Sequence, residues 1–493
     1  MLTSAHTKND ACRGKKLENQ TGIKSLAVEG LHEQFDVELE LKPGLNIIYG
    51  KNGKGKTTVL HILANALELD FKRFKYLSFR RIAISTFSGT KLEIFKSGSP
   101  ENVEVLINGE ATSLLSNSEN LSELEMVSIR SALGERSTYL PAFRSVLERV
   151  RDEASLYYRD RARDPSIDEL EALEFHALRE KSGIRRGRDM VATRALKEEA
   201  SITARKTFQC RQWFGSFVPT IRYPSIMEVD EGLTAEWRSA QFAMAEREQN
   251  MFADVFVKVF RTIVGLDNPQ KPFEIEDALA SIADSLDSKD YQLGNRRSEF
   301  ISAQLLDAMQ FVKDKPAHET KGIEKSVLGL YLETLIERKE ARKNALQSSR
   351  DFENSINTLF GKQKTLRIGE TAGREHLRSA VTVGTEGGRA YGLSALSSGE
   401  RQILTMLYSA SRSRFRDGIF LIDEPELSLH IDWQRMILNE LMSLAPNRQI
   451  IACTHSPEVG ADHFEDTQDF EPRLTKRPQE DLFDEMDDAV DGE

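Results

Sequence analysis

Short apolar runs separated by polar turns occupy the first part of the chain. Residues 35–41 alternate polar and apolar positions, which is typical of a half-buried strand, and residues 45–49 form a short apolar run that predicts a buried strand. The runs that follow are divided by turns rich in Ser and Gly, so they predict an antiparallel subsheet. These further strands are expected over residues 81–87, 91–95 and 103–107.

Two apolar runs in the last quarter of the chain carry polar residues directly after them. The run 418–422 ends in Asp423 and Glu424, and the run 449–453 leads to His455. Such runs predict buried parallel strands, whose carboxyl ends present polar side chains along one edge of a sheet. The overall pattern therefore predicts an α/β fold that contains a parallel sheet.

Long helical stretches replace this pattern between about residues 145 and 360. Leu328, Leu332 and Leu335 share one helix face, but no heptad pattern is sustained, so a compact helical bundle or a short coiled coil is favoured over an extended rod. Strand-like segments then resume, and we expect them to form the base of a second lobe. They cover residues 366–368, 380–383 and 389–393.

The pattern divides the chain into five parts, with two lobes that must pair because the helical insert interrupts a single α/β head. The parts are a disordered leader (1–21), a first lobe (22–145), a helical insert (146–360), a second lobe (361–460) and an acidic tail (461–493). The tail carries 13 Asp/Glu and 3 Lys/Arg, which predicts disorder and accounts for most of the formal net charge of −11. It would be a solubilising tail, a docking peptide for a basic partner or a DNA mimic.

Composition excludes several classes of protein. The 493 residues suffice for two or three domains, and 39% hydrophobic and 29% charged residues describe a soluble globular protein. Neither a secretory signal nor an apolar run long enough for a membrane span is found. Cys12, Cys210 and Cys453 lie far apart without metal-ligand spacing, so we expect a cytoplasmic location, and Cys453 is interpreted as a packing residue.

One segment of the insert is strongly basic. Residues 179–211 contain 10 Lys/Arg and 4 Asp/Glu. Such a cluster can follow the phosphates of a nucleic acid, bind an acidic protein surface or form a solvated helix face. Aromatic residues do not alternate with these cations in the way that single-strand binding proteins show.

The segment Gly50–Thr57 reads GxxxxGK[ST], the phosphate-binding loop of NTPases. It lies between the predicted strand 45–49 and a predicted helix over 57–69, where the amino end of the helix favours an anion. Lys56 would reach the β- and γ-phosphates, and the Thr57 hydroxyl would hold Mg²⁺. The simpler interpretation is a glycine-lysine surface turn. The candidate nucleotide contacts here are Asn52, Gly53, Gly55, Lys56, Thr57 and Thr58.

Three segments near the other end complete this picture. The segment 396–402 (LSSGERQ) precedes a predicted helix over 403–411, the run 418–422 leads into Asp423-Glu424-Pro425, and Thr454 begins the sequence THSPE. Together with the phosphate loop, these motifs resemble the ABC-type ATPase family, on its SMC, RecF and OLD-like branch. The resemblance covers roughly residues 22–145 and 360–460. Within this branch the chain resembles stand-alone ATPases of anti-phage defence systems, first the AriA type of PARIS and second the PtuA type of Septu.

This resemblance implies a fold and a role for each motif. The fold would be an ABC-type ATPase head, a P-loop NTPase with a mixed sheet and an antiparallel subdomain, interrupted by a large helical insert. Asp423 would complete the Mg²⁺ shell with Thr57, Glu424 would orient and polarise the attacking water, and His455 would sense the γ-phosphate. Otherwise these three would be polar residues at strand ends. The implied catalytic residues are Lys56, Glu424 and His455, with ATP and Mg²⁺ as cofactors; ATP rather than GTP follows from the resemblance alone.

The signature would act in trans. By resemblance, Ser397 and Gly399, with Ser398 between them, would contact the γ-phosphate of ATP held by a second subunit. Ser398 and Glu400 stand where transporters usually carry glycine and glutamine, which favours the SMC and OLD side. The family's Q-loop glutamine has no assigned counterpart in the first lobe.

Three charged or titratable residues near these motifs have open roles. The segment 137–144 resembles a strand-end PAxR element of the defence ATPases, and its Arg144 would sense nucleotide, anchor the hinge to the insert or lie on the surface. Glu426 and His430 follow Pro425 in a loop, where they would line a dimer interface or be exposed.

The resemblance implies an ATP-hydrolysing sensor and scaffold subunit in an anti-phage defence complex. We expect a homo-oligomer, at least a dimer and compatible with a hexamer, that controls a separate effector protein, a nuclease, and responds to a phage-encoded trigger. Only 38 residues follow His455 and no nuclease motif is visible, so we expect no nuclease activity in this chain. The alternative is a DNA-binding ATPase of the SMC or RecF type in recombination or repair, for which DNA binding by the basic segment would speak. A transporter subunit and a purely structural role are disfavoured, and no membrane partner is expected.

Overall fold

The structure of the chain is a computed structural model in which the residues form two compact units. The first unit contains Met1–Val229, Ser355–Gln363 and Leu393–Glu493, and the second contains Asp230–Asn354 and Lys364–Gly392. Each unit is described by itself. The described residues are 22–96, 103–112, 135–144, 190–263, 322–369, 379–411, 418–446 and 448–475, with isolated positions between 127 and 147. The predicted leader and residues 476–493 of the predicted tail lie outside them.

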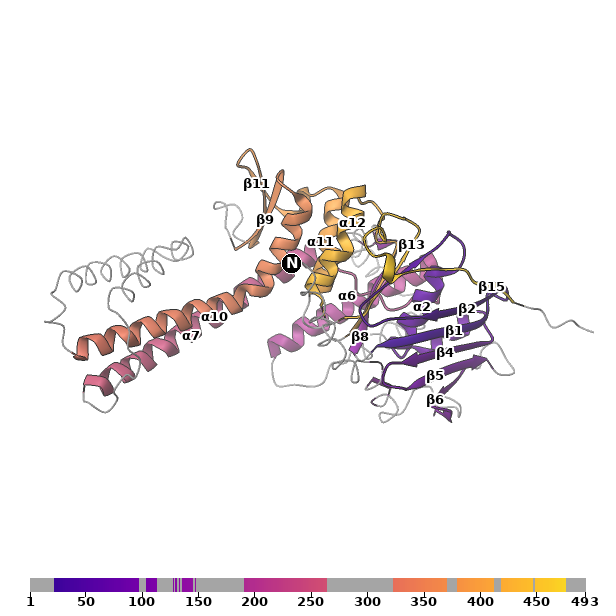
Figure 1. Cartoon of the computed structure of the whole chain (residues 1–493), viewed down its shortest axis with the longest axis horizontal. Coiled ribbons are helices and arrows are strands. Elements are labelled where there is room, and N and C mark those ends of the chain that lie inside the picture. Colours follow the sequence, from indigo (N-terminus) through magenta and orange to yellow (C-terminus); the bar gives the residue numbers. More distant parts are fainter. Residues whose placement is uncertain are drawn as a thin grey trace, which may run out of the picture. The chain divides into compact units, whose positions relative to one another are not determined.

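A five-stranded parallel sheet forms the centre of the first unit, in the order β14-β3-β13-β12-β8, of which Figure 1 labels β13 and β8. All four pairings are parallel, and every residue of β12 and β13 is buried. Continuous apolar runs of this kind require cover on both faces of the sheet. The strands are β3 (Leu45–Tyr49), β8 (Glu135–Leu140), β12 (Gly418–Asp423), β13 (Ile450–Thr454) and β14 (Thr467–Asp469).

A seven-stranded antiparallel sheet lies in the same unit, in the order β15-β2-β1-β4-β5-β6-β7. The predicted strands of the antiparallel subsheet are all present, whereas β1 was not predicted. Gln449, just before β13, joins the two sheets because its side chain accepts from Ile23 N at 2.8 Å and donates to Ile23 O at 2.7 Å. The strands are β1 (Ile23–Leu31), β2 (Phe35–Glu40), β4 (Arg81–Thr86), β5 (Lys91–Lys96), β6 (Val103–Ile107), β7 (Glu110–Ala111) and β15 (Arg473–Leu474).

Helices complete the head. The helix after the phosphate loop packs on β8, β12 and β13, and α11 packs on α12. The predicted helix over 403–411 begins earlier, at Ser398, inside the signature segment. The elements are α2 (Lys56–Leu67), η2 (Phe71–Tyr76), η5 (Leu393–Ala395), α11 (Ser398–Ser411), α12 (Ile431–Leu444) and η7 (Phe464–Asp466).

The predicted acidic tail begins too early at residue 461. Residues 467–469 form β14, which pairs in parallel with β3, and residues 473–474 form β15, which pairs with β2. Phe470 is buried between them, and its N–H donates to Tyr49 O at 2.6 Å. The acidic composition therefore conceals a segment that adds one strand to each sheet of the head.

Residues 190–229 of the predicted insert also group with the head. The helix α6 (Met190–Phe214) is followed by a segment that contacts the helix of the phosphate loop and the signature helix. Asn65 of α2 donates to Phe217 O at 2.8 Å, Arg222 forms an ion pair with Glu68, and Tyr223 shares a hydrogen bond with Thr405 of α11. Residues 145 and 360 are therefore not the boundaries between the head and the helical insert, as the sequence had predicted.

The second unit contains two long helices and a small sheet. The helices are α7 (Ile226–Ile263) and α10 (Gly322–Phe360), each of which also reaches into the first unit, and the sheet has the order β11-β10-β9. We expected these strands at the base of the second lobe, whereas they group with the helices, because Thr234 of α7 accepts from Ala380 N at 3.0 Å. The strands are β9 (Lys364–Ile368), β10 (Val381–Thr385) and β11 (Ala390–Tyr391).

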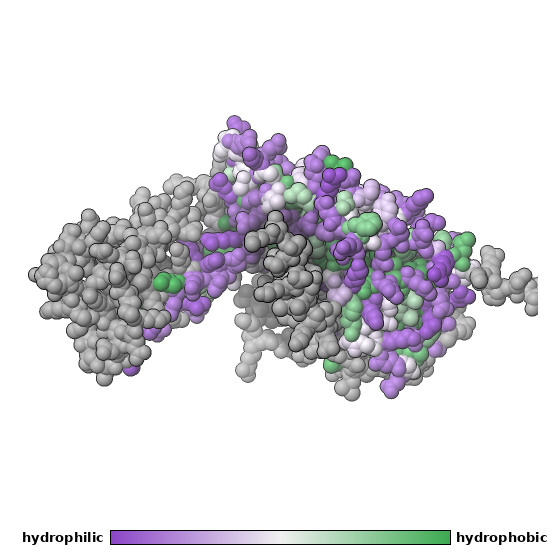
Figure 2. Space-filling view, in the orientation of Figure 1, coloured by the Kyte–Doolittle hydropathy of each residue, from purple (hydrophilic) through white to green (hydrophobic). Residues whose placement is uncertain are grey.

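Hydrophilic residues cover most of the described surface in the face that Figure 2 shows, with smaller hydrophobic patches between them. Most large apolar side chains of the strands are instead buried, with Tyr391 of β11 and Leu474 of β15 as exposed exceptions. Among the residues described, no helix combines the length and apolar character that crossing a bilayer needs.

Candidate nucleotide-binding and hydrolysis site

The phosphate loop connects β3 to α2 through backbone conformations that suit glycine. Gly53 has φ of 79° and Gly55 has φ of 97°, both in the left-handed region that other residues adopt only with strain. Gly55 is the N-cap residue of α2 and offers no side chain to the free N–H groups of the first turn. The amino end of α2 is thus a backbone anion site with the positive end of the helix dipole behind it.

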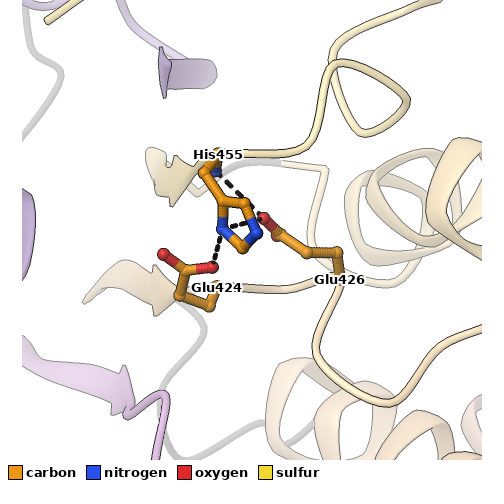
Figure 3. A group of neighbouring side chains, drawn as sticks. All are labelled: Glu424, Glu426 and His455. Atoms are coloured by element: carbon orange, nitrogen blue, oxygen red, sulfur yellow. Dashed lines mark hydrogen bonds and ion pairs between the residues drawn. The ribbon is translucent and has the colours of Figure 1, made fainter. Parts of the chain in front are cut away.

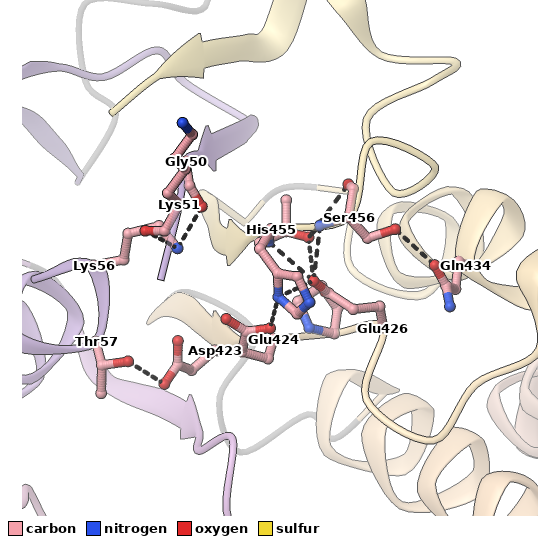
Figure 4. A network of polar contacts seen from close by, with 12 residues as sticks. Gly50, Lys51, Lys56, Thr57, Asp423, Glu424, Glu426, Gln434, His455 and Ser456 are labelled. Atoms are coloured by element: carbon pink, nitrogen blue, oxygen red, sulfur yellow. Dashed lines mark hydrogen bonds and ion pairs between the residues drawn. The ribbon is translucent and has the colours of Figure 1, made fainter. Parts of the chain in front are cut away.

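Lys56 lies over this loop with only 5% of its surface exposed. Its ammonium group donates to Gly50 O at 2.6 Å and Lys51 O at 3.0 Å (Figure 4). Asn52 is exposed in the loop, and the Thr58 hydroxyl lies 3.2 Å from Nε2 of His32. The structure therefore brings the predicted loop residues together around one turn of chain.

A hydrogen bond joins the phosphate loop to the end of β12. The Thr57 hydroxyl donates to Oδ2 of Asp423 at 2.8 Å, across 366 residues of sequence. Asp423 is fully buried, and its Oδ1 has no hydrogen-bond partner among the residues described. Burial raises the pKa of Asp423 to about 6, although the Thr57 hydrogen bond opposes this shift.

These observations fit a Mg²⁺ site. A buried carboxylate oxygen without a donor is costly unless a cation satisfies it, and a hydroxyl with a carboxylate is the oxygen set that Mg²⁺ takes beside substrate phosphates. The residues that would hold the ion are Thr57 and Asp423, as the sequence suggested.

Glu424 and His455 meet at the carboxyl ends of adjacent strands. Nδ1 of His455 forms a hydrogen bond with Oε2 of Glu424 (Figure 3). Burial and the neighbouring Glu426 raise the pKa of Glu424, while the contact with His455 lowers it. A carboxylate in this setting can accept a proton from a water molecule, and the imidazole can orient it.

The sequence left Glu426 either lining a dimer interface or exposed, whereas its side chain is buried within this chain. It is 6% exposed, and its Oε1 accepts from the Thr454 hydroxyl at 2.6 Å, His455 N at 3.0 Å and Ser456 N at 3.1 Å. This carboxylate therefore fixes the backbone that carries His455. The only sequence signal for this role of Glu426 was its position two residues after Glu424, the acid expected to polarise the attacking water. His430 lies exposed as the N-cap of α12, where its side chain accepts from Asp432 N.

Arg144 is fully buried, which excludes a surface position. It lies after β8, and its guanidinium donates to main-chain oxygens at the end of β12. Its hydrogen bonds join it to the protein backbone, so direct sensing of a nucleotide stays a prediction. The PAxR pattern marked the residue, but not the partner that lies 279 residues away.

The signature forms the first turn of α11. Ser397 and Glu400 form a capping box, because Glu400 Oε2 accepts from Ser397 N at 2.8 Å and the Ser397 hydroxyl accepts from Glu400 N at 3.4 Å. Ser397 and Ser398 are exposed, whereas Gly399 is buried. A Cβ at Gly399 would lie 2.7 Å from Ser428 O, so the close approach of the loop after β12 requires glycine.

Cys453 and two cations of the basic segment have structural explanations in the described residues. Cys453 is fully buried beside Lys56 O, and burial raises the pKa of its thiol, which agrees with packing rather than chemistry. In the described part of the basic segment, Lys206 forms an ion pair with Glu228, and Arg211 lies 3.4 Å from Asp70. Both cations are buried. Residues 179–189 of this segment lie outside the described residues.

Two family models match the chain. Residues 22–172 match a model described as "AAA domain", and residues 277–462 match one described as "AAA domain, putative AbiEii toxin, Type IV TA system". The chain thus carries AAA-type ATPase domains, and with the sheet order and the phosphate loop this establishes the predicted ABC-type ATPase head fold. Each model covers less than half of the chain.

A curated relative and solved structures are similar over different extents. The "Retron Vc95 probable ATPase" of Vibrio cholerae serotype O1 biovar El Tor is 28% identical over 152 residues, which cover 27% of this chain and 28% of the relative. SMC head domains from Pyrococcus furiosus, bound to the C-terminal domain of ScpA, and from Pyrococcus yayanosii align over 90% of this chain and 91% and 93% of theirs. Their identities are 13% and 14% and their TM-scores 0.36 and 0.35, which are too low to support an argument.

Proposed function

We propose that this chain binds and hydrolyses ATP and acts as the sensor and scaffold subunit of a cytoplasmic anti-phage defence complex. The observation that carries the enzymatic part is the convergence of three distant segments. Thr57 contacts Asp423 across 366 residues, and one residue further along Glu424 contacts His455. The same edge of the sheet thus holds a phosphate loop, a candidate metal site and a candidate base.

The residues divide the reaction between them. The loop amides at the amino end of α2 and the Lys56 ammonium bind the phosphates. Thr57 and Asp423 would hold Mg²⁺, which would supply positive charge beside the phosphates. Glu424 accepts a proton from the attacking water, and His455 fixes the Glu424 carboxylate through Nδ1. The outcome is inorganic phosphate and ADP.

The signature supports oligomerisation through the heads. Ser397 and Ser398 are exposed at the amino end of α11, where free N–H groups favour an anion. In the resembled ATPases such a segment completes the site of a second subunit. We therefore assign these residues to the γ-phosphate of ATP that another copy of the chain holds.

The defence role rests on the resemblance of the motifs, with support from the comparisons. One matching model is described by a toxin of a type IV TA system, and the curated relative is named as a retron ATPase. The effector would be a separate nuclease, and a phage-encoded protein would trigger its release. ATP turnover would then set whether the complex holds or releases the effector.

Affinity purification tests this proposal. The tagged chain is produced with its native neighbouring genes, as wild type and as Glu424→Gln, with ATP present, and native mass is measured. We expect a homo-oligomer that carries a stoichiometric effector, held more completely by the Glu424→Gln variant. Co-purified DNA without any protein partner would contradict the scaffold and favour the repair ATPase. The burial of Lys206 and Arg211 in ion pairs provides no support for that alternative.

A further inference from the structure

Arg144 is the largest fully buried side chain of the described residues, and hydrolysis as outlined above makes no use of it. Removing an arginine from water is expensive, and burial lowers its pKa. Within the described part of the chain it forms no ion pair with a carboxylate. Its hydrogen-bond partners are main-chain oxygens, while the nearby carboxylates of Asp423, Glu424 and Glu426 favour its charged form.

The oxygens that Arg144 binds belong to the turn that presents Glu424. Nη1 donates to Asp423 O at 2.9 Å and Nη2 donates to Glu424 O at 2.8 Å and Pro425 O at 3.3 Å. Nη1 also donates to Pro141 O at 3.2 Å in its own turn. The planar fork of a guanidinium suits such a set of converging acceptors, which an ammonium cannot contact together.

This turn has an unfavourable backbone conformation at Glu424. Its φ of 51° lies in the left-handed region, which costs conformational energy for a residue with a Cβ. The turn is held from both sides, because Glu424 N donates to Cys453 O at 2.8 Å while Arg144 binds Glu424 O. The direction of the Cα–Cβ bond, and with it the reach of the carboxylate to His455, follows from these two bonds.

We propose that Arg144 is a positioning residue for ATP hydrolysis, which holds the turn 423–425 so that the Glu424 carboxylate meets the attacking water. The inference rests on the proposed ATPase function. Glu426 directly follows this turn and holds it on its other side, because its carboxylate accepts hydrogen bonds from the Thr454 hydroxyl, His455 N and Ser456 N. Arg144 therefore connects the turn 423–425 to the segment after β8, and Glu426 connects it to residues 454–456.

A second buried arginine offers a matched control on the same two strands. Arg448 is 4% exposed, and it donates to Gly418 O at 2.9 Å and to the Thr138 hydroxyl at 3.0 Å. Gly418 begins β12, whereas Asp423 ends it. Arg448 thus stabilises β12 and β8 at the end away from the candidate site.

The experiment measures ATP turnover and nucleotide affinity for wild type, Arg144→Lys and Arg448→Lys, with melting curves to normalise for folded protein. We expect Arg144→Lys to lower kcat at least about tenfold, with an ATP Kd within about threefold of wild type. Arg448→Lys should lower the melting temperature while kcat of the folded fraction stays within about threefold. Equal kcat for wild type and Arg144→Lys would overturn the inference, and so would a loss of ATP affinity that matches the loss of turnover.

A double-mutant cycle separates positioning from general damage. If Arg144 acts through Glu424, Arg144→Lys should change kcat by less than about twofold when Glu424 is already Gln. A full further loss in that background would overturn the inference. If Arg144→Lys does not fold, Phe143→Leu serves as the test variant in its place. The Phe143 ring stacks on the Phe214 ring with their centroids 4.0 Å apart, and this contact would stabilise the turn that carries Arg144. We then expect a several-fold loss of kcat, and an unchanged kcat would refute the proposal. Absence of turnover in wild type would instead refute the proposed function.

Discussion

At the scale of single residues, the candidate site depends on side chains whose burial decides their chemistry. Asp423 is a fully buried carboxylate, and its Oδ1 lacks a donor among the described residues. Its cost in the fold is offset only when a cation binds, so the residue favours a metal over a solvated strand end.

Replacing Asp423 by Asn tests this assignment. The amide keeps the size of the side chain but loses the charge that a divalent ion requires, so the Mg²⁺ concentration for half-maximal turnover should rise at least about tenfold. The measurement is a Mg²⁺ titration at fixed ATP. Asp70→Asn is the control, because Asp70 is 4% exposed but pairs with Arg211, and its Mg²⁺ dependence should stay unchanged. Equal titrations for wild type and Asp423→Asn would reject the metal site.

His61 gives the head a dependence of stability on pH. It is 9% exposed in α2, Nε2 lies 2.8 Å from the Tyr139 hydroxyl, and burial lowers its pKa from 6.5 to about 4. Between pH 6.5 and about 4, His61 is protonated in the unfolded chain but stays neutral in the folded chain. The free energy of unfolding therefore falls as the pH falls through this range. The loss from this residue approaches about 3 kcal/mol.

The corresponding test compares unfolding free energies of wild type and His61→Gln between pH 7 and pH 4.5. The difference between the two curves should shrink steadily or invert as the pH falls, because the variant lacks the proton that destabilises the wild type. His430→Gln serves as control, since His430 is exposed at the N-cap of α12. Parallel curves for wild type and His61→Gln would show that His61 is not held neutral by the fold.

At the scale of elements, periodicity predicted most strands with a local apolar pattern, although it missed β1, and it did not predict the strands that are defined by a distant partner. The strands β3, β12 and β13 are continuous apolar runs. By contrast, β14 consists of Thr467, Gln468 and Asp469, and it exists because β3 offers a free edge. The partners of Arg144 and Glu426 were hidden for the same reason, since a charged residue does not encode which backbone it will bind.

Two truncations test the correction to the acidic tail. A chain that ends at Thr475 keeps β14, β15 and Phe470, whereas a chain that ends at His463 loses all three. The longer chain should match the full chain within about 0.5 kcal/mol. The shorter one should lose at least about 2 kcal/mol, because Phe470 is only 4% exposed in the head. Denaturant unfolding measures both, and equal stability of the two truncations would show that residues 464–475 are a solvated tail.

At the scale of the whole molecule, segments from both ends of the chain form one head. The phosphate loop and the end of β12 lie 366 residues apart in the sequence, while most of α7 and α10 belongs to the second unit. The proposed site is still incomplete in one copy, because the signature is assigned to the nucleotide of another. Under this proposal, turnover would require oligomerisation.

Mixing two inactive variants tests this requirement. Lys56→Ala removes the phosphate contact, and Ser398→Glu places a negative charge where the γ-phosphate of the partner would lie, in a helix turn that accepts an acidic residue. Each variant alone should be nearly inactive. A random one-to-one mixture of dimers should recover about a quarter of wild-type turnover, since half of the dimers contain one intact site of two. A mixture as inactive as its parents would contradict the assignment of the signature in trans.

The proposed role of Glu424, at the end of β12, is to activate water for hydrolysis of ATP bound at the phosphate loop. It is tested most directly by measuring ATP binding and phosphate release on the same preparations of wild type, Glu424→Gln and Lys56→Ala. We expect wild type to release phosphate in the presence of Mg²⁺, Glu424→Gln to bind ATP but to turn it over at least about a hundredfold more slowly, and Lys56→Ala to lose binding. Phosphate release by Glu424→Gln at the wild-type rate would contradict the account.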